Sequence, residues 1–147
     1  MDAFLQLAYA GTAAARDGRR DEARVLLSAA DTAYTGEVLA DEPDFDEAGP
    51  LRAEARRAHL AVMRALGGVH VAAGDLDSAA CAWSRLLADD PYDGDVALRL
   101  VTELTAAGRH GEAARQRRRY EVRMREFGIP ACGPYQSIHP SSDGLRR

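Results

Sequence analysis

"AAGDLDSAACAWSRLLADDP", residues 72–91, has the pattern of a corner between two helices. Gly74 is followed five residues later by Ala79, nine residues later by Trp83 and seventeen residues later by Pro91. Glycine allows the chain to reverse, a small alanine lets two helix backbones approach, and an aromatic ring fills the space left between them. Asp75 is a residue type that caps a helix N-terminus, and proline ends the helix before it. The stretch therefore predicts a structural corner and contains nothing catalytic.

The spacing from glycine to alanine occurs twice more, at Gly18 with Ala23 and at Gly108 with Ala113. From Gly74 to Gly108 is 34 residues, which is the period of the tetratricopeptide repeat (TPR). From Gly18 to Gly74 is 56 residues, so the first unit is followed by an insertion. The repeat predicts three helix pairs that turn on these glycines.

The third unit departs from the other two at its large residue. Arg117 stands where the second unit has Trp83 and the first has Leu27. We expect Tyr120, one helical turn later, to fill the space between the helices of the third pair.

Hydrophobic periodicity predicts an all-α, TPR-like stack of antiparallel helix pairs, a short superhelix of about six helices. The expected helices span about residues 3–16, 19–34, 51–73, 76–90, 93–108 and 111–128. We expect a helical module over residues 1–138 and a flexible tail over residues 139–147. The expected buried faces comprise Leu5, Ala8, Tyr9 and Thr12 in the first helix, Ala23, Leu26, Leu27, Ala30 and Tyr34 in the second, and Leu51, Ala55, Ala58, Val62, Leu66, Val69 and Ala73 in the third.

Two glycines interrupt the third expected helix. Gly67 and Gly68 each cost about 1 kcal/mol of helix stability relative to alanine. We expect a neighbouring helix to pack closely there rather than the helix to bend.

Composition limits the class of protein. A chain of 147 residues is long enough for one domain with its own core. The hydrophobic fraction is 46% but the aromatic fraction only 6%, which favours helices packed on helices. A net charge of −4 disfavours a surface that grips phosphate backbones as a whole. No apolar run approaches the roughly 18 residues of a membrane span, so we expect a soluble protein. Two distant cysteines do not support a disulfide framework, which favours a reduced cytoplasmic protein.

The cysteines and histidines lack the spacing of a chemical site. Cys81 and Cys132 lie far apart without metal-ligand spacing, and Cys81 is interpreted as a small packed hydrophobe in its helix. His59 and His70 are about three turns apart and too distant to share a metal, so each is interpreted as a partly buried or surface histidine. No arrangement for nucleophilic, phosphate-binding or metal chemistry occurs, and we expect no enzyme, no cofactor and no metal.

The segment between Gly36 and Pro50 is strongly acidic. Because carboxylates alternate at Asp44 and Asp46, a calcium loop is an alternative, but the glycine and closing glutamate of an EF-hand are missing. We favour a solvated connector. Its six acidic residues, with no basic one, are Glu37, Asp41, Glu42, Asp44, Asp46 and Glu47.

The last helix carries an excess of positive charge, and Arg115, Arg118, Val122 and Arg125 share one face of it. This face could dock an acidic protein surface or assist at nearby DNA phosphates. It could equally be a solvated face with a Glu121–Arg125 pair, or match the acidic connector within the chain. The candidate partner surface comprises Arg115, Arg118, Arg119 and Arg125.

Over about residues 2–138 the sequence resembles the bacterial transcriptional activator domain (BTAD). The motifs are the turn at Tyr34, Gly36 and Leu39, the helix led by Pro50, and the segments "AAGDLDSA", "AAGRHGEAARQ" and "REFGI". The resemblance implies a TPR-like module that lies C-terminal to a winged-helix DNA-binding domain in actinobacterial regulators of the antibiotic-regulatory (SARP) type.

The resemblance further implies a non-catalytic interaction module that dimerises with a sister protomer or contacts RNA polymerase. DNA would then be bound only through a separate winged-helix domain, whose pattern is not found in these residues. The chain is therefore expected to be a piece of a longer regulator or a free-standing relative. Two alternatives remain open, a TPR-type peptide-binding scaffold unrelated to transcription and the oligomerising part of a multidomain ATPase regulator.

Overall fold

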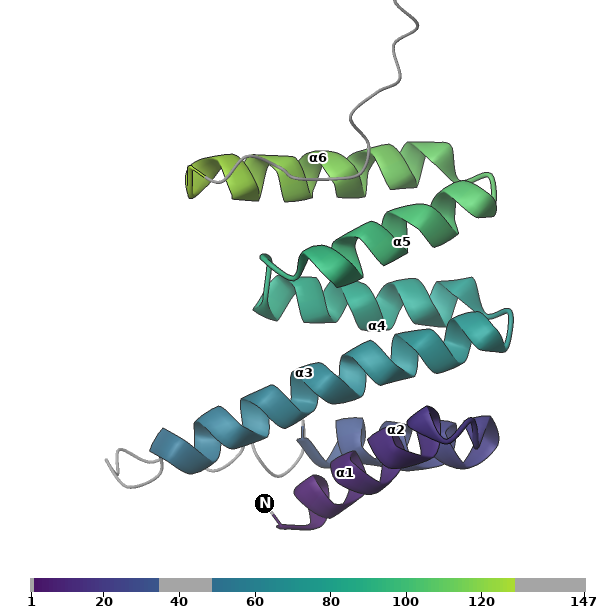
Figure 1. Cartoon of the computed structure of the whole chain (residues 1–147), viewed down its shortest axis with the longest axis vertical. Coiled ribbons are helices and arrows are strands. Elements are labelled where there is room, and N and C mark those ends of the chain that lie inside the picture. The colour runs from purple at the N-terminus through teal and green to yellow at the C-terminus, as the bar shows by residue number, and fades with distance from the viewer. Residues whose placement is uncertain (1, 35–48, 129–147) are drawn as a thin grey trace, which may run out of the picture.

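The computed structural model describes residues 2–34 and 49–128. These residues form six α-helices and no strand, and consecutive helices pack as antiparallel pairs stacked along the long axis (Figure 1), which confirms the predicted all-α class. The third helix begins two residues earlier than expected. The helices are α1 (Asp2–Arg16), α2 (Arg20–Ala33), α3 (Gly49–Ala72), α4 (Leu76–Asp89), α5 (Gly94–Ala106) and α6 (His110–Glu126).

The turns inside the three pairs share one backbone geometry. Gly18, Gly74 and Gly108 have φ of 77°, 76° and 76°, a left-handed conformation that favours glycine. At the second turn the Asp75 amide donates to the His70 carbonyl at 2.9 Å, and the Gly74 amide donates to the Val71 carbonyl at 2.9 Å. The same two bonds recur at the other two turns, so each first helix ends in a Schellman motif.

Aspartates begin the helices on either side of the α4–α5 turn. The Asp75 side chain accepts from the Ser78 amide at the start of α4, and the Asp93 side chain accepts from the Val96 amide at the start of α5. Pro91 lies two residues after the end of α4, where it prevents the helix from continuing. This turn connects the second helix pair, α3 and α4, to the third, α5 and α6.

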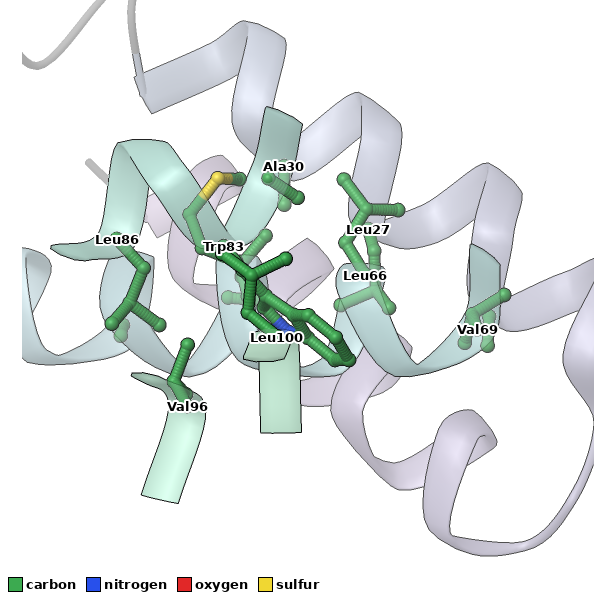
Figure 2. Close-up of a cluster of buried hydrophobic side chains, with 14 of the residues drawn as sticks. Leu27, Ala30, Leu66, Val69, Trp83, Leu86, Val96 and Leu100 are labelled. Carbon is green, nitrogen blue, oxygen red and sulfur yellow. The ribbon is translucent and has the colours of Figure 1, made fainter. Parts of the chain in front are cut away.

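Trp83 lies at the centre of the core. Its side chain is fully buried in the cluster drawn in Figure 2, which includes Leu66 and Leu100, and its indole Nε1 donates to the Arg64 carbonyl at 3.2 Å. A Cβ placed on Gly67 would lie 2.1 Å from this Nε1, well inside van der Waals contact. The close packing expected at the two glycines is therefore confirmed at Gly67. At Gly68 the nearest atom, from the Arg99 guanidinium, is 3.6 Å away.

The first pair repeats this contact with a smaller partner. Gly11 of α1 faces Leu27 of α2, and a Cβ on Gly11 would lie 2.9 Å from the leucine side chain. Gly11 precedes its turn glycine by seven residues, as Gly67 does. In the first two pairs, the repeat thus includes a glycine seven residues before the turn glycine. This glycine packs against the large residue that lies nine residues after the turn glycine.

The third pair lacks both members of that contact. Val101 stands seven residues before Gly108, and the exposed Arg117 stands nine after it. Tyr120 is half-buried instead, and a Cβ on Gly94 would lie 2.6 Å from its hydroxyl oxygen. The tyrosine therefore packs against the first turn of α5.

Several expected buried positions are wrong. In α1 the buried residues are Phe4, Ala8, Gly11 and Ala14, whereas Leu5 and Thr12 are half-buried and Tyr9 is 56% exposed. The expected buried face of α1 is rotated from the observed one, because the buried Gly11 has no side chain and adds nothing to the hydrophobic pattern.

The ends of the α3 stripe and Cys81 are also corrected. Leu51 is exposed, and Ala73 is exposed beyond the end of the helix. Cys81 is exposed rather than packed, because it lies about 200° around α4 from the buried Ala79.

Candidate partner-binding surface

The arginine-bearing helix α6 contributes little to the core. Ala113 is the one fully buried residue among its described positions, and the helix packs mainly on α5 at the end of the stack (Figure 1). Its other faces remain accessible. Residues 115–125 are therefore placed where a partner can reach them.

A groove of about 660 Å³ runs between α6, the second half of α4 and the start of α5. Arg115, Arg118 and Arg119 of the candidate surface line it, together with Arg123. Arg125 does not line it, so the structure divides the predicted set. The side of the groove formed by α4, the α4–α5 turn and α5 is apolar except for Ser84. The lining residues other than the arginines are Ser84, Leu87, Ala88, Pro91 and Ala97 on this side and Gln116, Tyr120, Val122 and Glu126 on α6.

The groove arginines differ from the other arginines of the fold in their partners. Arg64, Arg85 and Arg109 form ion pairs that link separate helices or close a turn. Within residues 2–34 and 49–128, neither Arg118 nor Arg119 forms an ion pair. Arg118 and Arg119 thus line the groove without an ionic partner in the described part of the chain.

The ion pair expected at the end of this helix is also different. Arg123 pairs with Glu126 at 3.4 Å, and no Glu121–Arg125 pair forms between these two described residues. At the other end, the pKa of Glu112 is lowered chiefly by hydrogen bonds from Arg109 and to a lesser degree by the charge of Arg115. Arg109 and Arg123 thus have carboxylate partners near the two ends of α6.

A second groove, of about 640 Å³, lies on the other side of the α4–α5 turn. Pro91 lines both grooves, so they meet at this turn. The second groove is lined by residues of the first half of α3 and of the turn, namely Arg52, Ala53, Arg56, Arg57, Leu60, Asp89, Asp90, Pro91 and Tyr92.

A family model of the bacterial transcriptional activator domain matches residues 1–139 of the chain. The chain belongs to this family. No curated protein and no solved structure matched it in the corresponding comparisons. The BTAD family is a non-catalytic regulatory domain of bacterial transcriptional activators, and membership favours a role in transcription over a peptide scaffold unrelated to it.

The BTAD fold also contains a polar cluster that sequence reasoning missed. Arg85 of α4 donates two hydrogen bonds to the Asp31 carboxylate of α2, at 2.7 and 2.8 Å. His59 of α3 lies 3.0 Å from the same carboxylate through Nε2, and because an ionised carboxylate only accepts, Nε2 is the donor. Partial burial acts to raise the pKa of Asp31, but these hydrogen bonds outweigh it and lower the pKa. The cluster joins three helices of two pairs.

His59 corrects the expected picture of the histidines. It is buried at 5% exposure, and its ring stacks on Tyr34 with centroids 3.8 Å apart. The sequence could have indicated this burial, because His59 lies three and four residues before the hydrophobic Val62 and Met63, the spacing of one helix face. His70 is half-buried and lies 3.8 Å from the Asp75 carboxylate.

Some expectations fall outside the described residues. They concern the acidic connector and its calcium alternative, Cys132, and the tail boundary at residue 138. In the described part of the chain, no three His, Cys, Asp or Glu side chains gather as a metal site requires. None of the described helices is long and apolar enough to cross a membrane.

Proposed function

We propose that this BTAD acts as a protein-interaction module in transcription activation, and that the α6 groove is the surface that contacts its partner. The partner is RNA polymerase or a sister protomer. The observation that carries the proposal is that Arg118 and Arg119, which form no ion pair with another described residue, line a groove together with apolar side chains. Arginine and apolar side chains together are typical of protein interfaces.

The groove wall favours a protein partner over a nucleic acid. A phosphate backbone is bound by charge and hydrogen bonds, and it gains nothing from Leu87, Ala97 and Val122 beside the arginines. A protein surface offers carboxylates for the guanidinium groups and apolar side chains for the wall. We therefore expect no sequence-specific DNA binding by this chain in a gel-shift assay at physiological salt.

The test is a triple charge reversal, Arg115→Glu with Arg118→Glu and Arg119→Glu. Self-association is measured by analytical ultracentrifugation, and affinity for purified RNA polymerase holoenzyme is measured by biolayer interferometry. We expect one of these interactions in the wild type and a loss of at least about tenfold in the variant, because close charge pairs at interfaces are worth several kcal/mol together. Helicity and thermal melting should change little.

The chain offers a matched control on its first pair. Arg16, Arg20 and Arg24 are exposed helical arginines that form no ion pair with other described residues. Reversing all three changes the net charge equally but leaves the groove intact. Arg125→Glu, on α6 but outside the groove lining, should behave like this control. A wild type that neither self-associates nor binds polymerase, or a control that weakens binding as much as the groove variant, contradicts the proposal.

A further inference from the structure

Two aromatic side chains lie exposed where the grooves meet. Tyr92 of the α4–α5 turn and Phe127 at the end of α6 are in edge contact, with ring centroids 4.5 Å apart and planes at 68°. They remain 42% and 60% exposed, respectively. An edge-to-face pair is worth only about 0.5–1.5 kcal/mol beyond area burial, so the fold gains little from rings that it leaves in water.

The aromatic pair lies between the two basic surfaces. Tyr92 lines the α3 groove, Pro91 before it lines both grooves, and Glu126 before Phe127 lines the α6 groove. In Figure 1 the end of α6, the α4–α5 turn and the first half of α3 all lie on the left side of the stack. The grooves and the aromatic pair therefore form one continuous surface.

Charge on both sides of the rings has the same sign. Arg115, Arg118, Arg119 and Arg123 outnumber Glu126 in the α6 groove. In the α3 groove, three arginines outnumber Asp89 and Asp90. Asp90 also caps the turn through the Tyr92 amide at 3.3 Å, and Arg56 donates to the Asp89 backbone carbonyl at 2.8 Å.

The sequence contains no lysine, so all of its permanently charged basic side chains are arginines. Guanidinium groups bind carboxylates in a bidentate manner, and aromatic residues with arginine are the commonest energetic centres of protein interfaces. A ligand that fits this surface carries carboxylates on both sides of an apolar side chain.

We infer that the Tyr92–Phe127 pair anchors an acidic, partly apolar peptide segment of the partner, whose carboxylates reach the arginines of both grooves. This inference rests on the proposed function for the α6 groove and extends the site to Arg56 and Arg57 of α3. The apolar anchor supplies the specificity that distinguishes such a segment from other polyanions.

The probe is a fluorescein-labelled synthetic peptide with the sequence GEVLADEPDFDEA, taken from residues 36–48 of the chain. It carries six carboxylates, no basic residue, and the apolar side chains of Leu39 and Phe45. Binding to the full chain is followed by fluorescence anisotropy. We expect saturable binding that weakens at least tenfold when the six acids are replaced by their amides. A peptide with Phe45→Ala should bind about fivefold more weakly.

On the protein side, Phe127→Ala and Tyr92→Ala should each weaken peptide binding about fivefold, with unchanged helicity. Val25→Ala is the matched control, because Val25 is 64% exposed on α2 and lines neither groove. Paired reversal of Arg56 and Arg57 to glutamate should weaken binding at least fivefold, and Arg24→Glu should not.

The outcomes separate this inference from the proposed function. Loss of binding in Arg118→Glu with no change in either aromatic variant overturns the aromatic anchor and leaves the α6 groove as the partner surface. Equal displacement of the peptide by random duplex DNA shows a general polyanion surface and also overturns the inference, as does the absence of peptide binding at millimolar concentration. If both RNA polymerase binding and self-association fail while the peptide still binds through the rings, the proposed partner is wrong and the peptide site stands.

Discussion

Gly67→Ala should destabilise the protein although alanine is the better helix former. The added Cβ would lie 2.1 Å from Nε1, 2.4 Å from Cε2 and 2.5 Å from Cδ1 of Trp83. The indole is fully buried and must move by more than about 1 Å to restore ordinary contact, which breaks its hydrogen bond to the Arg64 carbonyl. Overpacking of this kind costs about 1–3 kcal/mol, and the lost hydrogen bond costs about 1 kcal/mol. The gain in helix propensity offsets about 1 kcal/mol, so the net loss is about 1–3 kcal/mol.

Gly68→Ala is the matched control one residue away. Its Cβ would meet only the Arg99 guanidinium at 3.6 Å, an ordinary contact. The helix-propensity gain then remains, and the free energy of unfolding should rise by about 1 kcal/mol. The two alanine substitutions, at neighbouring positions of one helix, are therefore expected to change the free energy of unfolding in opposite directions.

The assay is urea and thermal unfolding, followed by far-UV circular dichroism and by the fluorescence of Trp83, the single tryptophan of the chain. We expect Gly67→Ala to lower Tm by roughly 3–9 °C and Gly68→Ala to raise it by about 3 °C. Trp83→Leu in the Gly67→Ala background should recover part of the loss that Gly67→Ala causes. A Gly67→Ala variant as stable as Gly68→Ala would falsify the close-packing argument.

Two further predictions concern aspartates. Asp31→Asn should cost about 1–3 kcal/mol at neutral pH, because it weakens the bidentate acceptor of Arg85. Since the folded pKa of Asp31 is lowered, its contribution is present above its unfolded pKa of about 4 and is lost as pH falls through the folded pKa. Urea unfolding of wild type and variant between pH 7 and 2 should therefore converge at the acid end, and a difference independent of pH would count against the ion pair. Asp75→Ala should lower the free energy of unfolding by about 1 kcal/mol, because it removes an exposed helix cap. Asp93→Ala should lower it by about 2–3 kcal/mol, because the 7% exposed carboxylate of Asp93 both caps α5 and pairs with Arg64. Equal losses in urea unfolding would show that the Arg64 pair contributes nothing.

The repeat could be predicted from the sequence because its turns depend on local residue types. Glycine in a left-handed turn and a small residue five positions later are visible in one dimension. The face of α1 could not be predicted in this way, since the buried Gly11 carries no hydrophobic signal and its role depends on Leu27 across the pair. A search for glycines seven residues before each turn would have found it.

The candidate surface, too, was predictable where it depends on local sequence and not where it depends on packing between helices. The excess of arginine in α6 is a property of composition and was visible, but the separation of Arg125 from the groove depends on where α4 lies. The Asp31–Arg85 pair joins residues 54 positions apart, and no periodicity within one helix indicates it. The Tyr92–Phe127 pair likewise forms only when α5 and α6 bring the two ends of their hairpin together.

The position of α6 at the end of the stack sets how often its backbone opens. α3 is enclosed by α1, α2 and α4, whereas α6 packs mainly on one neighbour and buries one alanine among its described residues. Amide hydrogen exchange reports such local opening, and it is fastest where few buried contacts must be broken. The amides of α6 should therefore exchange before those of α3, and a partner seated against α6 should slow exchange there first. The amide exchange rate of α6, the helix that carries Arg118 and Arg119, should therefore report whether a partner is bound.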